Sequence, residues 1–201
     1  MATEVKTRGR GRPDEGARDA IIEAATQLFI ERDYAYVSTD EILERAGVSR
    51  GALYHHFPSK RDLFREVFDL SEARAVERIA QSLVGVEDPV ELLVAAARSY
   101  LREAETSEEL RRLGILQSRV VLGWQGWRDV ADKYGLAVTR TLLGAAMDAG
   151  AIKKRDLTTL SHVVLAALWE GATLIATADD RASARADAEA VVLDIVEGLR
   201  V

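Results

Sequence analysis

The side chains best suited to chemistry gather in one short segment, AGVSRGALYHHFPSK, residues 46–60 of this 201-residue chain. The segment holds two of the three histidines of the chain, together with two serines, an arginine, a tyrosine and a lysine. Such groups could hold a metal, could transfer protons in catalysis, or could contact another molecule. The elements that position these side chains decide among the three.

A metal site and acid–base catalysis are both disfavoured in this segment. His55 and His56 are adjacent, so on a helix their side chains project about 100° apart. The chain has no cysteine, and no third ligand stands nearby to complete a zinc site. Catalysis needs a pocket, which a short surface helix does not supply. We therefore expect no metal, no cofactor and no enzymatic activity, and contact with another molecule is favoured.

Local capping signals place the segment on two short helices joined by a tight turn. Ser38 and Glu41 form a capping box that begins one helix, and Gly47 is a typical helix stop. Ser49 can then cap a second helix over about 50–56. Two short helices with a glycine turn are the helix-turn-helix pattern, whose second helix enters the major groove of DNA.

Helical periodicity and caps recur along the rest of the chain, and no alternating strand pattern of useful length is present. The sequence therefore predicts an all-α protein of about nine helices. Besides the two short ones, helices are expected at about 17–32, 60–84, 89–105, 107–123, 124–149, 157–178 and 181–200. The last two are apolar over a broad face, which is typical either of core packing or of contact with a second copy of the chain.

The short helix after Gly47 presents groups that suit DNA. Arg50 can bond guanine O6 and N7 in bidentate fashion, or a phosphate. Tyr54 lies four residues later, on the same face. Leu53 and Phe57 are also four apart and are better explained as the anchor of the helix in the core.

The segment STDEILERAGVSRGALYHHFPSKRDLF, residues 38–64, resembles the DNA-binding region of the TetR/AcrR family of transcriptional regulators, and the resemblance extends over about 17–77. It is carried by Ile42, Ala46-Gly47-Val48-Ser49, Leu53-Tyr54, Phe57, Ser59-Lys60, Leu63 and Phe64. Leu43 departs from the alanine that the family often has there. By position, the resemblance implies DNA contacts from Thr39, Ser49, Arg50, Gly51, Tyr54, His55 and Lys60.

The same resemblance implies a domain organisation and partners. A helix-turn-helix domain would span 17–77, with its motif at 38–57, and an effector-binding and dimerisation domain would span 78–201. The partners would be double-stranded operator DNA, a small-molecule effector, and a second copy of the chain bound through helices 157–178 and 181–200.

Residues 1–16 are expected to form a flexible basic arm that contains RGRGRP at 8–13. Arg10 and Arg12 could enter the minor groove of A·T-rich DNA. Alternatively the arm adds only sequence-independent attraction to phosphates, and we favour that interpretation for specificity. The net charge of −6 argues against a generally basic coat but leaves room for a local basic patch.

No catalytic motif appears beyond about residue 85, so a ligand cavity between helices is expected there. Six residues are candidates for its lining, with Arg119 as a further polar anchor; alternatively the aromatic ones are ordinary core or interface residues. Glu170 would need a partner if it were buried. The six are Tyr100, Gln117, Trp124, Trp127, Trp169 and Glu170.

The sequence shows no signal peptide, and the longest uninterrupted apolar run, 163–169, is too short to span a membrane. We therefore expect a cytoplasmic, dimeric DNA-binding regulator without membrane contact. The favoured mechanism is a repressor that releases a palindromic operator when it binds a small molecule. The alternatives are an activator, a ligand-independent DNA-binding regulator, or an all-α binding protein or enzyme without DNA activity.

Overall fold

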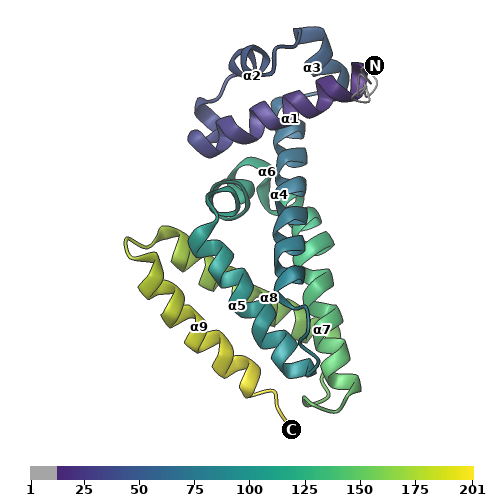
Figure 1. Cartoon of the computed structure of the whole chain (residues 1–201), viewed down its shortest axis with the longest axis vertical. Coiled ribbons are helices and arrows are strands. Elements are labelled where there is room, and N and C mark those ends of the chain that lie inside the picture. Colours follow the sequence, from purple (N-terminus) through teal and green to yellow (C-terminus); the bar gives the residue numbers. More distant parts are fainter. Residues whose placement is uncertain (1–12) are drawn as a thin grey trace, which may run out of the picture. The chain divides into compact units, whose positions relative to one another are not determined.

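A computed structural model of the chain describes residues 13–201, and within that range it contains helices and no strand (Figure 1). The predicted all-α class is confirmed. The described residues belong to two compact units, which divide between Phe64 and Arg65. Arg10 and Arg12 lie outside the described residues.

The first unit is a small helical bundle. Its elements are α1 (Pro13–Glu31), the 3₁₀ turn η1 (Tyr34–Tyr36), α2 (Thr39–Ala46), α3 (Arg50–His56) and the first turn of α4 (Lys60–Ser82). Phe29 and Phe64 meet edge to face, with ring centroids 5.2 Å apart, and both are fully buried together with Ile42 and Leu53. Each of the four helices therefore contributes one of these side chains to the buried core of the unit.

The turn between α2 and α3 forms as the caps predict. The Ser38 hydroxyl accepts from the Glu41 N–H, and the Glu41 carboxylate accepts from the Ser38 N–H, so the capping box is complete. Gly47 ends α2 with φ 66°, a left-handed conformation that favours glycine. The Ser49 hydroxyl then accepts from the Ala52 N–H and caps α3.

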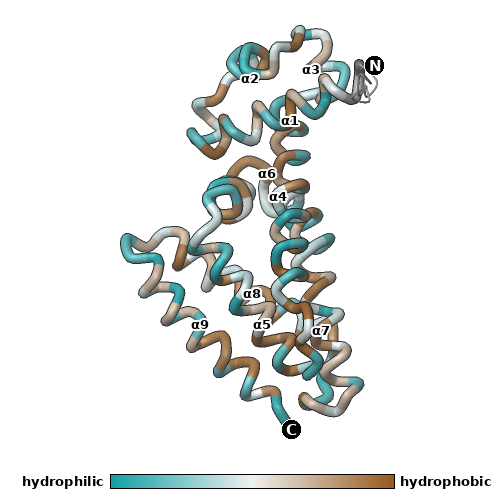
Figure 2. Tube along the Cα trace, in the orientation of Figure 1, coloured by the Kyte–Doolittle hydropathy of each residue, from teal (hydrophilic) through white to brown (hydrophobic). Residues whose placement is uncertain are grey.

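The second unit is a larger bundle in which α8 (Leu157–Thr177) packs against α5 (Pro89–Thr106), α7 (Ala137–Asp148) and α9 (Arg181–Glu197). Asp88, Asp156 and Asp180 cap α5, α8 and α9, because each side chain accepts from one or two backbone N–H groups of the first turn. The apolar residues of α9 gather in its C-terminal half (Figure 2), where Val192 and Val196 join the buried core.

The predicted helices 107–123 and 124–149 are divided differently in the structure. Their elements are the π-helical segment η2 (Leu110–Gln117), α6 (Ser118–Ala131), a second π-helical segment η3 (Asp132–Leu136) and α7. The interruption expected near Gly123 is present, because that residue has φ 68° and ψ 174° inside α6. The π segments were not expected, since a wider turn leaves no mark on the apolar period of so short a stretch.

One helix of the described chain, α8, is long and apolar enough to cross a bilayer by length and composition alone. The uninterrupted apolar run 163–169 is only part of this apolar helix, which extends over Leu157–Thr177. Since α8 packs against three other helices and buries Leu165, Leu168 and Ile175 in the bundle, the core explains part of its apolar character, while Val163 and Leu174 are exposed.

Candidate nucleic-acid interface and effector cavity

The helix α3 presents a polar face outward and an apolar face inward. Arg50, Gly51 and His55 are exposed, and the Tyr54 side chain is 45% exposed. Leu53 and Phe57 are buried. The arrangement expected from the spacing is therefore present, with the candidate DNA contacts on the side away from the core.

Arg50 has a partner within its own unit. Its guanidinium donates a hydrogen bond to the Asp40 carboxylate on α2. Both side chains are largely exposed, 62% and 70% respectively, and exposed ion pairs contribute at most about 1 kcal/mol. Arg50 can therefore exchange this carboxylate for a base edge or a phosphate at little cost.

Thr39 and Ser49 stand at the starts of the two motif helices. Thr39 is the first residue of α2 and is half-buried. Ser49 is exposed, and its hydroxyl oxygen is occupied by the Ala52 N–H at 3.2 Å. The Ser49 O–H hydrogen can still be donated to a phosphate oxygen.

Lys60 lies at the start of α4 with its ammonium turned toward the η1 turn. Its Nζ donates to the carbonyl oxygens of Tyr34 and Val37 at 2.9 and 2.7 Å, and it lies 4.0 Å from the centroid of the Tyr34 ring. Burial lowers the pKa of Lys60 below its ordinary value, and the Glu41 charge opposes that effect. Only one of the three ammonium donors remains for a phosphate, so the structure gives Lys60 a structural role that the sequence did not reveal.

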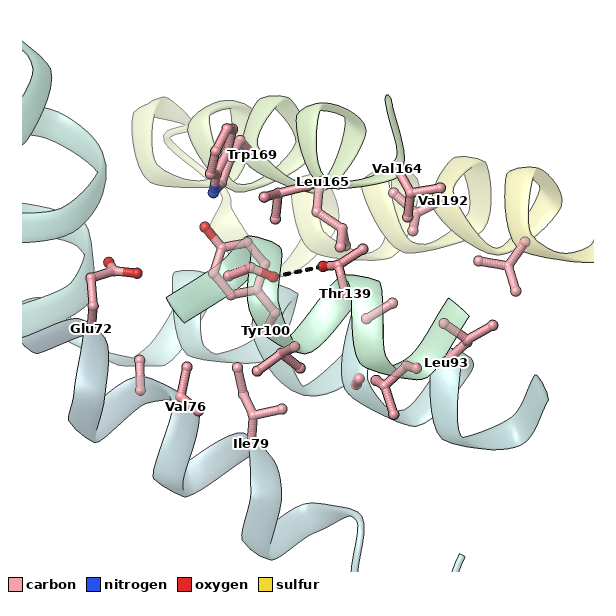
Figure 3. A pocket seen from close by; sticks show the side chains of 18 residues that line it. Glu72, Val76, Ile79, Leu93, Tyr100, Thr139, Val164, Leu165, Trp169 and Val192 are labelled. Atoms are coloured by element: carbon pink, nitrogen blue, oxygen red, sulfur yellow. Dashed lines mark hydrogen bonds between the residues drawn. The ribbon is translucent and has the colours of Figure 1, made fainter. Parts of the chain in front are cut away.

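A mostly apolar cavity lies in the second unit, enclosed by α4, α5, α7, α8 and α9 (Figure 3). It encloses about 70 Å³ of free space. Tyr100 and Trp169, two of the predicted ligand residues, line it, as do Glu72, Ala75, Val76, Ile79, Leu93, Ala96, Ala97, Gly135, Val138, Thr139, Leu142, Val164, Leu165, Leu168, Val192 and Val196.

A second, smaller cavity of about 20 Å³ shares Glu72, Tyr100 and Trp169 with the first. Trp127 and Arg119 also line it. The Trp127 and Trp169 rings have centroids 4.5 Å apart, and the Arg119 guanidinium carbon lies 4.1 Å from the Trp127 centroid.

Glu72 is the one carboxylate common to both cavities, and the sequence prediction missed it. Burial raises the pKa of Glu72 to about 7, and the neighbouring Asp69 charge adds to that effect. Burial also raises the pKa of Tyr100, helped by the Glu72 charge and opposed by Arg119. A signal was available, because Glu72 follows Phe68 by four residues and precedes Ala75 by three, within the buried stripe of α4.

Three of the predicted ligand residues do not line these two cavities. Trp124 is 62% exposed and covers one side of Trp127, with centroids 5.1 Å apart. Gln117 is buried within η2. Glu170 is exposed, so it needs no buried partner. Trp124 and Trp127 differ in burial because residues three apart on a helix project about 60° from each other.

An apolar surface covers one side of α8 and α9. Val163, Leu174, Val191 and Ile195 are exposed there. A groove of about 510 Å³ runs between the two helices and includes Glu170 in its lining. Exposed apolar residues gathered on adjacent helices are typical of a protein–protein contact.

A helix-turn-helix unit followed by a larger helical unit indicates a DNA-binding transcriptional regulator. Comparison with known families agrees. The family described as bacterial regulatory proteins, tetR family, matches residues 21–67, and the tetracyclin repressor-like C-terminal domain matches residues 90–199. The chain belongs to the TetR family of bacterial transcriptional regulators, and the resemblance seen in the sequence is confirmed.

Individual relatives differ in their reported action. The transcriptional activator FasR of Mycolicibacterium smegmatis is 33% identical over 53% of this chain and 48% of its own length. The transcriptional repressor AcnR of Corynebacterium glutamicum is 28% identical over 90% of this chain and 91% of its own. A TetR-family regulator structure from Pectobacterium atrosepticum has TM-score 0.80 and 28% identity, covering 96% and 98% of the two chains. This chain spans about half the length of several curated relatives that it matches.

Proposed function

We propose that this chain is a cytoplasmic, homodimeric repressor that binds a palindromic operator and releases it when a small molecule occupies the cavity of the second unit. The observation that carries the proposal is the outward face of α3, where Arg50, Tyr54 and His55 are exposed while Leu53 holds the helix to the core. A dimer places two such helices in successive major grooves, so its operator has two half-sites about one helical turn apart.

The α8–α9 surface supports the dimer. Four exposed apolar side chains on two adjacent helices, Val163, Leu174, Val191 and Ile195, lose unfavourable contact with water when a second copy covers them. Glu170 at the edge of the groove would then face the partner.

The continuity of α4 supports ligand control. This single helix contributes Lys60 and Phe64 to the first unit, and Glu72, Val76 and Ile79 to the cavity wall. A ligand acts on DNA affinity only through its different affinities for the two arrangements of the protein. The 70 Å³ cavity is smaller than the roughly 150 Å³ that accommodates benzene. An effector must therefore widen the space and displace wall helices such as α4.

A mobility-shift assay with the DNA upstream of the chain's own gene tests the proposal. We expect a shift at low salt that fades steeply as salt rises, because phosphate contacts release counterions. Absence of a shift at low salt would overturn the proposal. Arg50→Ala should abolish preference for the operator over random DNA, and Lys154→Ala, at an exposed loop position of equal charge, is the matched control.

Activation is the second candidate action, and it rests on one observation: FasR, one of the relatives, is an activator. Transcription from the chain's own operator in the presence and absence of the protein separates the two. A rise on adding the protein identifies an activator, and a fall identifies a repressor.

A further inference from the structure

Glu72 is placed where a ligand, rather than the protein, can satisfy it. Its carboxyl group lines both cavities, and it has no hydrogen-bonding or ionic partner among the described residues. Figure 3 shows the carboxyl directed away from the α4 axis toward the space beside Tyr100. A partly buried carboxylate without a partner is costly, so a group that pairs with it gains unusual affinity.

The backbone of η2 passes close to this carboxyl. Gly114, in the π-helical segment η2, faces Glu72, and a Cβ at that position would lie 2.9 Å from the Glu72 Oε1. Any side chain there would displace the carboxyl group. The glycine therefore leaves room for Glu72 where η2 passes α4.

Aromatic rings surround the same space. Tyr100, Trp127 and Trp169 line the smaller cavity, and the faces of such rings attract cations. Arg119 already places one cation there, because its guanidinium carbon lies 4.1 Å from the Trp127 centroid and 5.9 Å from the Trp169 centroid. Arg119 is exposed, so water and the aromatic rings already stabilise its charge, whereas partial burial disfavours the charge of Glu72 and raises its pKa.

We propose that the effector is an amphiphilic organic cation, whose protonated nitrogen pairs with Glu72 between the Tyr100 and Trp169 rings while its apolar part fills the larger cavity. This inference rests on the proposed ligand-binding role of the cavity and names the chemical class of the ligand. The larger cavity, which is almost entirely apolar apart from Glu72, Tyr100 and Thr139, suits a hydrocarbon or aromatic portion.

The affinity of the cavity for a cation should depend on pH, because Glu72 must be ionised to pair with it. The groups that face it are Asp69 on its own helix, Tyr100 on α5 and Arg119 on α6, and Asp69 is itself bonded to Lys133 and Tyr134. A bound cation favours the ionised form of Glu72 and lowers its pKa from about 7. Affinity for a cation should therefore rise with pH up to about 7, by at most about tenfold per unit, and then level off.

Three probes with eight carbon atoms each test the class of head group: n-octylamine, octanoate and 1-octanol. Near neutral pH the first is cationic, the second anionic and the third uncharged. Binding can be followed by tryptophan fluorescence, since two of the three tryptophans line the smaller cavity. We expect octylammonium to bind at least about tenfold more tightly than octanol, a difference of about 1.4 kcal/mol, and octanoate to bind least.

The variant Glu72→Gln keeps the shape of the side chain and removes its charge. It should lose the preference for octylammonium and its pH dependence while binding octanol as before. Glu77→Gln, at an exposed position of the same helix, is the matched control and should change neither. Should Glu72→Gln misfold, the pH dependence of octylammonium binding to the unaltered protein still tests the proposal.

Three results would overturn the inference: no saturable binding of octylammonium, equal or tighter binding of octanoate, or an unchanged preference in Glu72→Gln. A mobility-shift assay with the same probes distinguishes this failure from failure of the proposed function. Release of the operator by octanoate or octanol alone overturns the cationic class and retains ligand control. Tight octylammonium binding that leaves the DNA complex intact retains the site and overturns ligand control by that cation.

Discussion

Replacing Lys60 by methionine tests whether this residue holds the first unit together or contacts DNA. The substitution keeps most of the aliphatic stem and removes the ammonium group. The ammonium makes two hydrogen bonds, at 2.9 Å to the Tyr34 carbonyl and at 2.7 Å to the Val37 carbonyl, and it lies 4.0 Å from the Tyr34 ring centroid.

The expected loss follows from these contacts. A net hydrogen bond contributes about 1 kcal/mol, more when the donor is charged, and a partly exposed cation–π contact about 0.5 kcal/mol. Lys60→Met should therefore lower the free energy of unfolding by about 2–3 kcal/mol. For a chain of this length, Tm should fall by about 5–10 °C.

Thermal and urea denaturation followed by circular dichroism measure the loss, and Lys154→Met in an exposed loop is the control. DNA affinity is then measured well below Tm over a range of salt. A phosphate contact would reduce the slope of log affinity against log salt by about 0.9. An unchanged Tm together with a slope reduced by about one would refute the structural role and support the contact that the sequence suggested.

Four further changes have defined outcomes. Tyr54→Ala should weaken operator binding about tenfold and leave Tm unchanged, because the side chain is 45% exposed; a lower Tm would contradict this. Gly47→Ala should cost about 1 kcal/mol in urea denaturation, since φ is 66° and no atom lies within 4 Å of the new Cβ; equal stability would argue against the left-handed turn. The Ser38 N–H and Arg32 lower the pKa of Glu41 to about 2, so its stabilisation is full above its ordinary pKa and is lost as pH falls toward 2. The stability difference between the protein and Glu41→Gln at pH 6 should accordingly vanish near pH 2, and a persistent difference would refute the assignment. Leu174→Glu should yield a monomer in size-exclusion chromatography if the α8–α9 surface forms the dimer, and an intact dimer would exclude that surface.

Local features of the fold were predictable because their causes lie within a few residues. The capping box of Ser38 and Glu41 and the cap Asp156 each satisfy N–H groups no more than three positions away. The left-handed turn at Gly47 needs only a residue without a Cβ. The outward polar face of α3 follows in the same way from the spacing of Leu53 and Phe57.

The candidate DNA face was therefore readable from the sequence to a large extent, with Lys60 as the exception. Its spacing fits a phosphate contact, but its two carbonyl partners lie 26 and 23 positions earlier in the chain. The helical spacing of apolar residues cannot predict a hydrogen-bond partner so distant in the sequence. Tyr34 and Val37 become neighbours of Lys60 only once α1 and α4 share the core that contains Phe29 and Phe64.

The presence of a cavity between the helices of the second unit was predictable, but its full lining was not. The aromatics of the second unit indicated a pocket, and Tyr100, Trp127 and Trp169 line the two cavities whereas Trp124 does not. The two neighbouring tryptophans differ because packing against Trp169 determines which side of α6 turns inward.

The sequence by itself thus determined the helices, their ends and the face of α3, because short-range hydrogen bonds and apolar spacing control those features. Only the tertiary structure brought Glu72 beside Tyr100 and Gly114, because these residues lie on three different elements, α4, α5 and η2. Burial, and with it the raised pKa of Glu72, depends on the neighbours that folding supplies. The chemistry of the cavity therefore follows from packing, whereas the helix-turn-helix follows from local sequence.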